Sequence, residues 1–455
     1  MSKIDNKSFR KELFALAIPL ALQHLLGSLV GASDALMLGR LTQESISAVS
    51  LANQVSFVMN LFVWAVIGGV SALISQYYGK KDYATVKNLL SMSMRYVFGI
   101  TFVFFAVTFF APEFLMKLFT NEAELITIGA GYLRIVSFSY IFSGLTQCYL
   151  MLMKIDGRAK ISVWISAVTV VVDMVADFFL IYGFGNIPAL GANGSAYSTI
   201  VVELVAFIWV VVASYQKDKI HPDFKSFVFF SKSLEKDMLK VAGPMLASCL
   251  SWGLSMSVHA AIIGHLGTDA TAAFSVTNVA TSLIQCLAQG FASGLGIMIG
   301  GKLGQNLLDD AKIYGRNSWI ISIIIGFANA LLLCVVGPAV YYFYVLEPVA
   351  KYYLVRMIIF NILYMFAYSF NTIFTVGVFP AGGDAMYDAV SVAIATWCFA
   401  LPLCLVGCFF FHWPVMLVYI VMCSDEIVKV PFLIPRYRQY IWLKNLTREQ
   451  EEVKG

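Results

Sequence analysis

Two stretches of this sequence, residues 13–39 and 238–264, decide the fold, and they read LFALAIPLALQHLLGSLVGASDALMLG and MLKVAGPMLASCLSWGLSMSVHAAIIG. Each is longer than the about 20 apolar residues that a helix needs to cross a bilayer. A shift of 225 positions (244 minus 19) brings Pro19 onto Pro244, and Gly39 then falls on Gly264. The chain is therefore predicted to contain two copies of one membrane unit.

The same shift continues beyond these stretches without a gap. It aligns residues that are mostly glycine or small and polar, which mark backbone bends and close contacts rather than generic apolar filling. The further pairs are Leu41 and Leu266, Ala48 and Ala273, Ser50 and Ser275, Asn53 and Asn278, Gly69 and Gly294, and Gly79 and Gly304. Two similar halves can form a site at their interface and expose it to either side of the membrane in turn, as transporters do.

The composition places the whole chain in a membrane. Hydrophobic residues make up 59% of the 455 residues and charged residues only 13%, against roughly 25% charged in soluble domains. The apolar runs lack the alternation of a β-barrel strand, so helices are expected. Twelve spans are predicted at 13–38, 46–77, 90–112, 128–153, 161–183, 192–215, 238–264, 270–300, 317–345, 352–378, 387–410 and 413–435.

The predicted fold class is an all-α membrane protein with two six-helix lobes, related by a pseudo-twofold axis along the membrane normal. Its predicted parts are a cytoplasmic segment 1–12, an N-lobe 13–215, a linker 216–237, a C-lobe 238–435 and a cytoplasmic tail 436–455.

Charge placement predicts the orientation. Lys and Arg gather in the connectors after spans 2, 4, 6 and 8 and after span 12, and basic connectors stay on the cytoplasmic side. Both termini are therefore expected inside an integral membrane protein of the bacterial cytoplasmic membrane. This bias explains the net charge of +4 without a nucleic-acid partner. The eight cysteines form no CxxC pair, so packing thiols are expected rather than metal or disulfide sites.

Three aspartates lie deep in predicted spans. Placing a charged side chain there costs free energy, so such residues are expected to have a function. They are Asp34 in span 1, and Asp173 and Asp177 in span 5, which share one helical face because they are four residues apart. Desolvation and a like charge nearby both favour the protonated carboxyl, so this cluster is predicted to exchange a proton near neutral pH. The same oxygens would equally suit sodium, with Asp34 and Asp177 as ligands, and the residues do not choose between the two ions.

Neighbouring spans offer further polar groups to the same cavity. In the first half these are Asn53, Ser56, Asn60, Ser195, Thr199 and Glu203, and in the second half His259, Asn278, Tyr364, Tyr368 and Asn371. His259 could relay protons, although a histidine in such a place more often only packs and hydrogen-bonds. Glu203 could equally line the cavity or pack between helices. Asp34 maps onto His259, and the region of Asp173 and Asp177 maps onto apolar sequence. The cation chemistry is therefore expected in the first half alone, with Asp425, Glu426 and Lys429 as an interfacial ion pair.

Several stretches together resemble the multidrug and toxic compound extrusion (MATE) transporters. They are Ile18-Pro19, Ser33 to Leu41, Ala48 to Asn53, Tyr132 to Ile135, Asp177 to Gly183, Gly194 to Thr199 and Gly382-Gly383-Asp384. The resemblance implies alternating access and export of small organic, often cationic, compounds in exchange for protons or sodium. It also implies Asp34 and Asp177 as coupling carboxylates, Thr199 as a further ligand and Pro19 as a helix bend.

This chain departs from the family pattern at three places. Asp173 stands where the related branch usually has Asn, Trp252 stands where some members have a glutamate, and span 10 lacks an aspartate. The last two departures argue against a cation site in the second half.

Two other functional classes make different demands on the sequence. A flippase for lipid-linked saccharides of related architecture is the alternative, and it would need basic groups in its cavity for a phosphate. An enzyme is not predicted, because no HExxH, GxSxG or P-loop pattern is present, and no cofactor is expected beyond the coupling ion. The expected partners are substrates and membrane lipids, and nothing demands more than a monomer.

Overall fold

The computed structural model describes residues 6–38, 41–185, 188–216, 219–222, 227, 231–344 and 346–449. Gly39 and Arg40, much of the predicted linker and both chain ends therefore lie outside the described residues.

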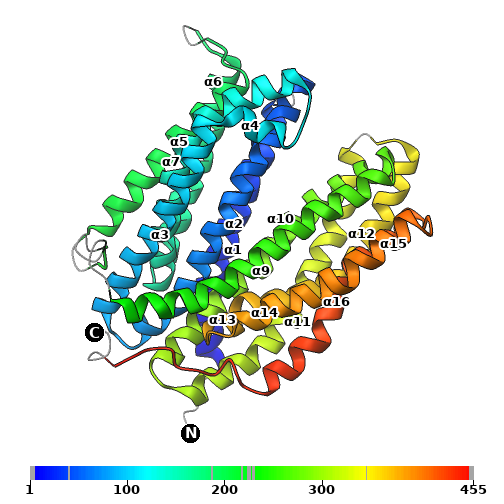
Figure 1. Cartoon of the computed structure of the whole chain (residues 1–455). Helices are drawn as coiled ribbons and strands as arrows, with labels where there is room; N and C mark the ends of the chain where they lie inside the picture. The colour runs from blue at the N-terminus through cyan, green and yellow to red at the C-terminus, as the bar shows by residue number, and fades with distance from the viewer. Residues whose placement is uncertain are drawn as a thin grey trace. The chain divides into compact units, whose positions relative to one another are not determined.

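The described elements are helices, which confirms the predicted all-α class (Figure 1). In the first half they are α1 Asn6–Leu38, α2 Gln43–Gly79, α3 Tyr83–Phe110, α4 Pro112–Lys117, α5 Ala123–Ile155, α6 Ala159–Tyr182 and α7 Ala192–Ser214. In the second half they are α9 Lys232–His265, α10 Thr268–Gly304, α11 Leu308–Phe343, α12 Pro348–Thr372, η1 Ile373–Val378, α13 Phe379–Ala381, α14 Ala385–Val392, η2 Ala393–Ala400, α15 Leu401–Phe409 and α16 Val415–Arg438.

Eleven helical segments of the described residues are long and apolar enough to cross a membrane. The twelfth predicted span, 413–435, is the helix α16, which carries Asp425, Glu426 and Lys429 near its middle. The tenth and eleventh spans also differ from simple α-helices, because η1 and η2 are π-helical turns within them. Such turns are rare in proteins, and where they occur they often lie at functional sites.

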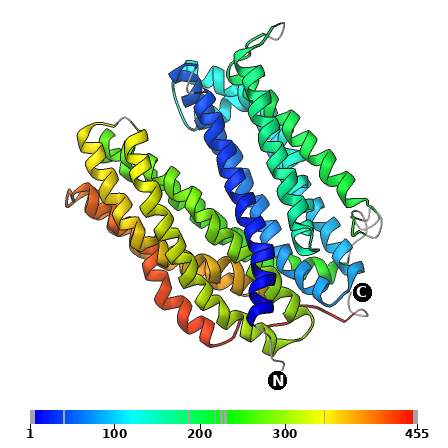
Figure 2. The same ribbon diagram turned by 180° about the vertical axis from the view of Figure 1, so that it is seen from behind.

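Contacts divide the chain into two compact units. The C-unit comprises residues 1–24, 75–81 and 239–448, and the N-unit comprises residues 25–74, 82–238 and 449–455. These units do not follow the predicted lobe boundaries, since the start of α1 and the end of α2 pack in the C-unit. The helices α1, α2 and α9 therefore each belong to both units. Pro19 lies inside α1, which runs as one helix from Asn6 to Leu38 (Figure 2).

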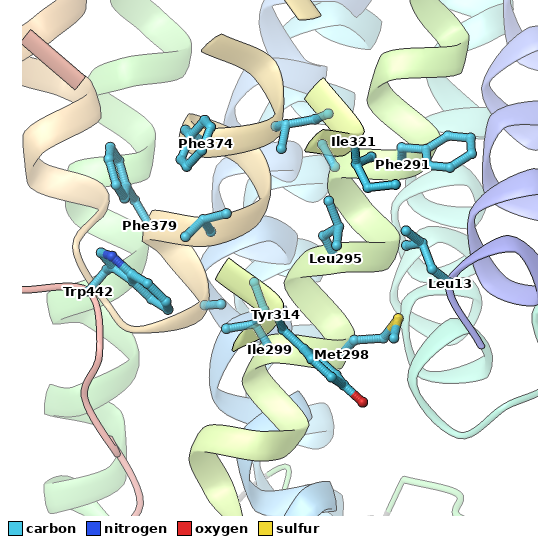
Figure 3. Packing of buried hydrophobic residues seen from close by; sticks show 14 of the residues in the cluster. Leu13, Phe291, Leu295, Met298, Ile299, Tyr314, Ile321, Phe374, Phe379 and Trp442 are labelled. Atoms are coloured by element: carbon cyan, nitrogen blue, oxygen red, sulfur yellow. The ribbon is translucent and has the colours of Figure 1, made fainter. Parts of the chain in front are cut away.

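Aromatic and aliphatic side chains fill the core of the C-unit. Phe9 and Leu13 of α1 are buried there with Phe291 of α10, and Figure 3 shows the same core continuing to Phe374 and Trp442. Trp442 is fully buried although it follows α16, and its ring stacks on Tyr437 with the centroids 5.7 Å apart. The beginning of the predicted cytoplasmic tail is thus part of the core.

Gln76 of α2 forms hydrogen bonds with the segment that follows α16. Its side-chain amide donates to the Ala381 carbonyl at 2.7 Å and to the Lys444 carbonyl at 3.2 Å. Its side-chain oxygen accepts from the Leu446 amide at 2.7 Å. The fully buried side chain therefore satisfies three backbone groups on two separate segments.

Two glycines on α10 differ sharply in the space around them. A Cβ at Gly304 would overlap the backbone carbonyl of Gln76, whereas a Cβ at Gly301 would meet nothing within 4 Å. We expect Gly304→Ala to cost about 1–3 kcal/mol or more, because a backbone group cannot rotate away. The matched change Gly301→Ala should leave the melting temperature in detergent unchanged or slightly higher. Equal melting temperatures for the two variants would contradict this close approach of α2 and α10.

Candidate functional site

Three carboxyl groups of the N-unit lie together. One oxygen each from Asp34 of α1 and from Asp173 and Asp177 of α6 lie within 4.8 Å of one another. Asp173 and Asp177 are 4% and 1% exposed, and Asp34 is half-buried. The predicted shared face of the fifth span therefore meets the first span at this carboxyl trio.

The packing of the neighbouring helices places the trio. A Cβ at Gly194 would overlap the Leu180 carbonyl, so α6 and α7 approach closely there. One turn further along α7, the Ser198 hydroxyl lies 3.5 Å from an Asp173 carboxylate oxygen and 3.3 Å from its backbone carbonyl. At the end of α6, the Tyr182 hydroxyl donates to the Met37 carbonyl at 2.7 Å and ties α6 to the end of α1.

The trio is short of hydrogen-bond donors. Both oxygens of Asp177, one of Asp173 and one of Asp34 are buried and meet no donor among the described residues. Carboxylate oxygens only accept hydrogen bonds, so three such groups can share a buried space stably only when a proton or a cation lies between them. Their oxygens are hard ligands, which suit a proton or a small hard cation rather than a soft transition metal.

Polar side chains of α2 and α5 form hydrogen bonds with one another in the N-unit, and one of them lies near the trio. The Tyr132 hydroxyl donates to the Asn53 side-chain oxygen at 3.2 Å and interacts electrostatically with all three aspartates. Further along α2, Ser56 hydrogen-bonds the Tyr140 hydroxyl at 3.0 Å, and Asn60 accepts from Gln147 at 3.4 Å. The polar residues predicted on α2 are thus paired with polar residues of α5.

Thr199 and Glu203, the predicted site residues further along α7, have different surroundings. The Thr199 hydroxyl donates to the Ser195 carbonyl of its own helix at 3.0 Å, and the α7 hydroxyl beside Asp173 belongs to Ser198. Glu203 is half-buried and interacts with Ser143 and with the charge of Asp173. Ser198 was not among the predicted site residues. It is next to Thr199 in sequence, and its side chain points in a different direction from the helix axis.

The predicted cavity residues of the second half lie in the C-unit. His259 is 3% exposed, and its Nε2 meets no partner among the residues that the structure describes. Tyr364 and Tyr368 are neighbours with ring centroids 6.2 Å apart, and the Tyr368 hydroxyl accepts from Gln289 at 3.0 Å. Asn278 is exposed.

The charged residues predicted on the last span form a group with a further acid of the C-unit. Lys429 and Glu426 form an ion pair of 2.7 Å, and their side chains are only 6% and 12% exposed, so the pair is buried within the protein. Lys429 also interacts with Asp425 and with Asp388 of α14. The comparison of the two halves could not find this group, because its members have no counterparts in the first half.

Comparisons with known proteins agree with this architecture. The family model described as MatE matches residues 19–179 and 244–406. The chain is 23% identical to the uncharacterized transporter YisQ of Bacillus subtilis, over 98% of this chain and 97% of that protein. It is also 23% identical to the probable multidrug resistance protein YoeA of the same species, over 97% of this chain and 96% of that protein.

Solved structures share the fold across nearly the whole chain. A substituted form of the MATE transporter VcmN of Vibrio cholerae has a TM-score of 0.88 at 18% identity, covering 97% of this chain and 98% of that chain. A transporter of the MOP superfamily from Pyrococcus furiosus has a TM-score of 0.86 at 18% identity, covering 95% of each chain. Because the family model matches well over half of the residues, this protein belongs to the MatE family of multidrug and toxic compound extrusion transporters.

Proposed function

We propose that this protein is a cation-coupled multidrug efflux antiporter, in which the carboxyl trio binds the coupling ion. The observation that carries the proposal is the trio itself, whose buried oxygens lack donors. A proton or sodium ion supplies the missing positive charge, and its loss leaves carboxylates that repel one another. Binding and release of the ion would thereby favour different shapes of the N-unit.

The class of substrate follows from the relatives. Several of them are named as probable multidrug resistance proteins, so small organic compounds, often cationic, are the proposed cargo. Alternating access then exports the compound while the ion enters. A flippase for lipid-linked saccharides is less well supported, because a phosphate needs basic partners and the charged cluster of the N-unit is acidic.

The basic connectors support a place for the protein in the cytoplasmic membrane with both termini inside. A monomer is sufficient for the proposed activity, because all three carboxyl groups come from one chain.

The coupling ion can be identified in vesicles that contain only this protein. We expect an imposed gradient of protons or of sodium to drive uptake or release of a dye such as ethidium, and only the true coupling ion should do so. Each gradient is applied at zero membrane potential, and empty vesicles and the variant Asp34→Asn serve as controls. Dye movement that is indifferent to both gradients would contradict the proposed antiport.

A further inference from the structure

The charge cluster of the C-unit consists of Asp388, Asp425, Glu426 and Lys429. Each acid has its own set of contacts. Glu426 pairs with Lys429, and Asp425 accepts from the Thr396 hydroxyl at 3.1 Å and from the Glu426 amide at 2.7 Å. Asp388 accepts a hydrogen bond from the Ser248 hydroxyl of α9.

The charges of this cluster do not balance. Three carboxyl groups face one ammonium group, and Asp388 has no ion pair within 4.0 Å in the described part of the chain. Uncompensated charge inside membrane-spanning helices is costly, so such a group is expected to bind a further cation. Asp425 has no ion pair within that distance in that part of the chain either, but it interacts more strongly with Lys429, so Asp388 is the carboxyl whose charge is least compensated.

The two π-helical turns supply hydroxyl groups to the cluster. Thr375 of η1 interacts with Asp388, and Thr396 of η2 hydrogen-bonds Asp425. Each turn thus brings one hydroxyl to one carboxyl, on either side of α14. The irregular backbone of these two spans therefore positions hydroxyl groups next to carboxyl groups.

Two residues that interact with the cluster each carry a buried acceptor without a partner among the described residues. Asn371 is 2% exposed, and its amide nitrogen donates to the Glu426 carbonyl and side chain at 2.6 Å each. Those two bonds fix the amide, so its oxygen is left as a buried acceptor that meets no donor among the described residues. His259, whose Nε2 is likewise unpaired in that part of the chain, interacts with Lys429.

We propose that Asp388 is a proton-exchange site in the C-unit, separate from the carboxyl trio and next to the ion pair of Glu426 and Lys429. The proton binds a carboxylate oxygen of Asp388 and leaves to water, and no other bond changes. The groups that face Asp388 are Ser248 and Cys249 of α9, Thr375 of η1, and Glu426 and Lys429 of α16. The inference extends the proposed function, because it assigns coupling to both units.

Infrared difference spectra between acid and alkaline buffer test this site in the full-length protein. The background carries Asp34→Asn, Asp173→Asn, Asp177→Asn and Glu203→Gln, so neither the trio nor the half-buried acid beside it contributes a carboxylic-acid signal. We expect a remaining buried carbonyl band, sensitive to heavy water, that is lost on adding Asp388→Asn. Asp388→Glu should restore such a band, and Lys429→Gln should move its midpoint to more alkaline pH because a positive charge is removed.

Asp309→Asn is the matched control, since Asp309 is an exposed acid in the first turn of α11. It should leave the buried band intact. A band that survives Asp388→Asn, or the absence of any band in the trio-free background, would overturn the second site. The proposed function is judged separately, from the bands lost when the trio itself is replaced.

Discussion

Asp177→Asn is expected to reduce ion-driven dye efflux to the level of empty vesicles while the protein folds normally. Asp177 is 1% exposed, and neither of its carboxylate oxygens meets a donor among the described residues. The asparagine has almost the same shape but cannot bind and release a proton. The measurement is dye transport in reconstituted vesicles under an imposed ion gradient, with Asp34→Asn expected to behave in the same way.

The melting temperature separates this role from a structural one. The amide introduced by Asp177→Asn would donate to the unpaired oxygens of Asp34 or Asp173, so stability should hold or rise by about 1 kcal/mol. A merely structural carboxylate would lose stability instead. Asp173→Asn provides the comparison, because Asp173 already has the Ser198 hydroxyl as a neighbour and should lose less transport. Equal losses for Asp173→Asn and Asp177→Asn would indicate that the pair acts as one unit.

Gln76→Ala is expected to destabilise the protein more than any other single polar truncation on α2. The change leaves the Ala381 and Lys444 carbonyls and the Leu446 amide without their partner. A buried polar group that loses its partner costs about 1–3 kcal/mol, which applies in full to the hydrogen bond to the Ala381 carbonyl and in part to the two half-buried ones. The melting temperature in detergent should fall accordingly, and limited proteolysis should cut the chain after Arg438.

Gln54→Ala is the matched control, since Gln54 is an exposed glutamine on the same helix. It should change the free energy of unfolding by less than about 0.5 kcal/mol. If both variants melt at the wild-type temperature, the tail is not held by Gln76.

Much of the fold was predictable from the sequence, and so was the grouping of the three aspartates. The spans and their repeat follow from apolar length, and Asp173 and Asp177 follow from their spacing on one helical face. That the α7 hydroxyl beside Asp173 belongs to Ser198 was not predictable, because the choice between Ser198 and Thr199 depends on the rotation of α7 against α6 at Gly194. Pairwise helix packing of that kind leaves no periodic signal in the chain.

The charge cluster of the C-unit shows a different limit. Asp388 and Lys429 are far apart in sequence, and they meet only because α14 packs beside α16 within the C-unit. The π-helical turns that bring Thr375 and Thr396 to the cluster have no sequence signature either. The charged residues of the last span, by contrast, were visible as an exception to its apolar composition.

The membership of α1 in both units has a mechanical consequence. Asp34 belongs to the N-unit, while Phe9 and Leu13 of the same helix are sealed in the aromatic core of the C-unit. No loop interrupts the backbone between them to absorb strain, so a tilt of one end must either turn the other end or be taken up by bending. Pro19 lacks the amide hydrogen of a normal helical residue and so removes one backbone hydrogen bond of α1. The helix is therefore expected to bend most easily there.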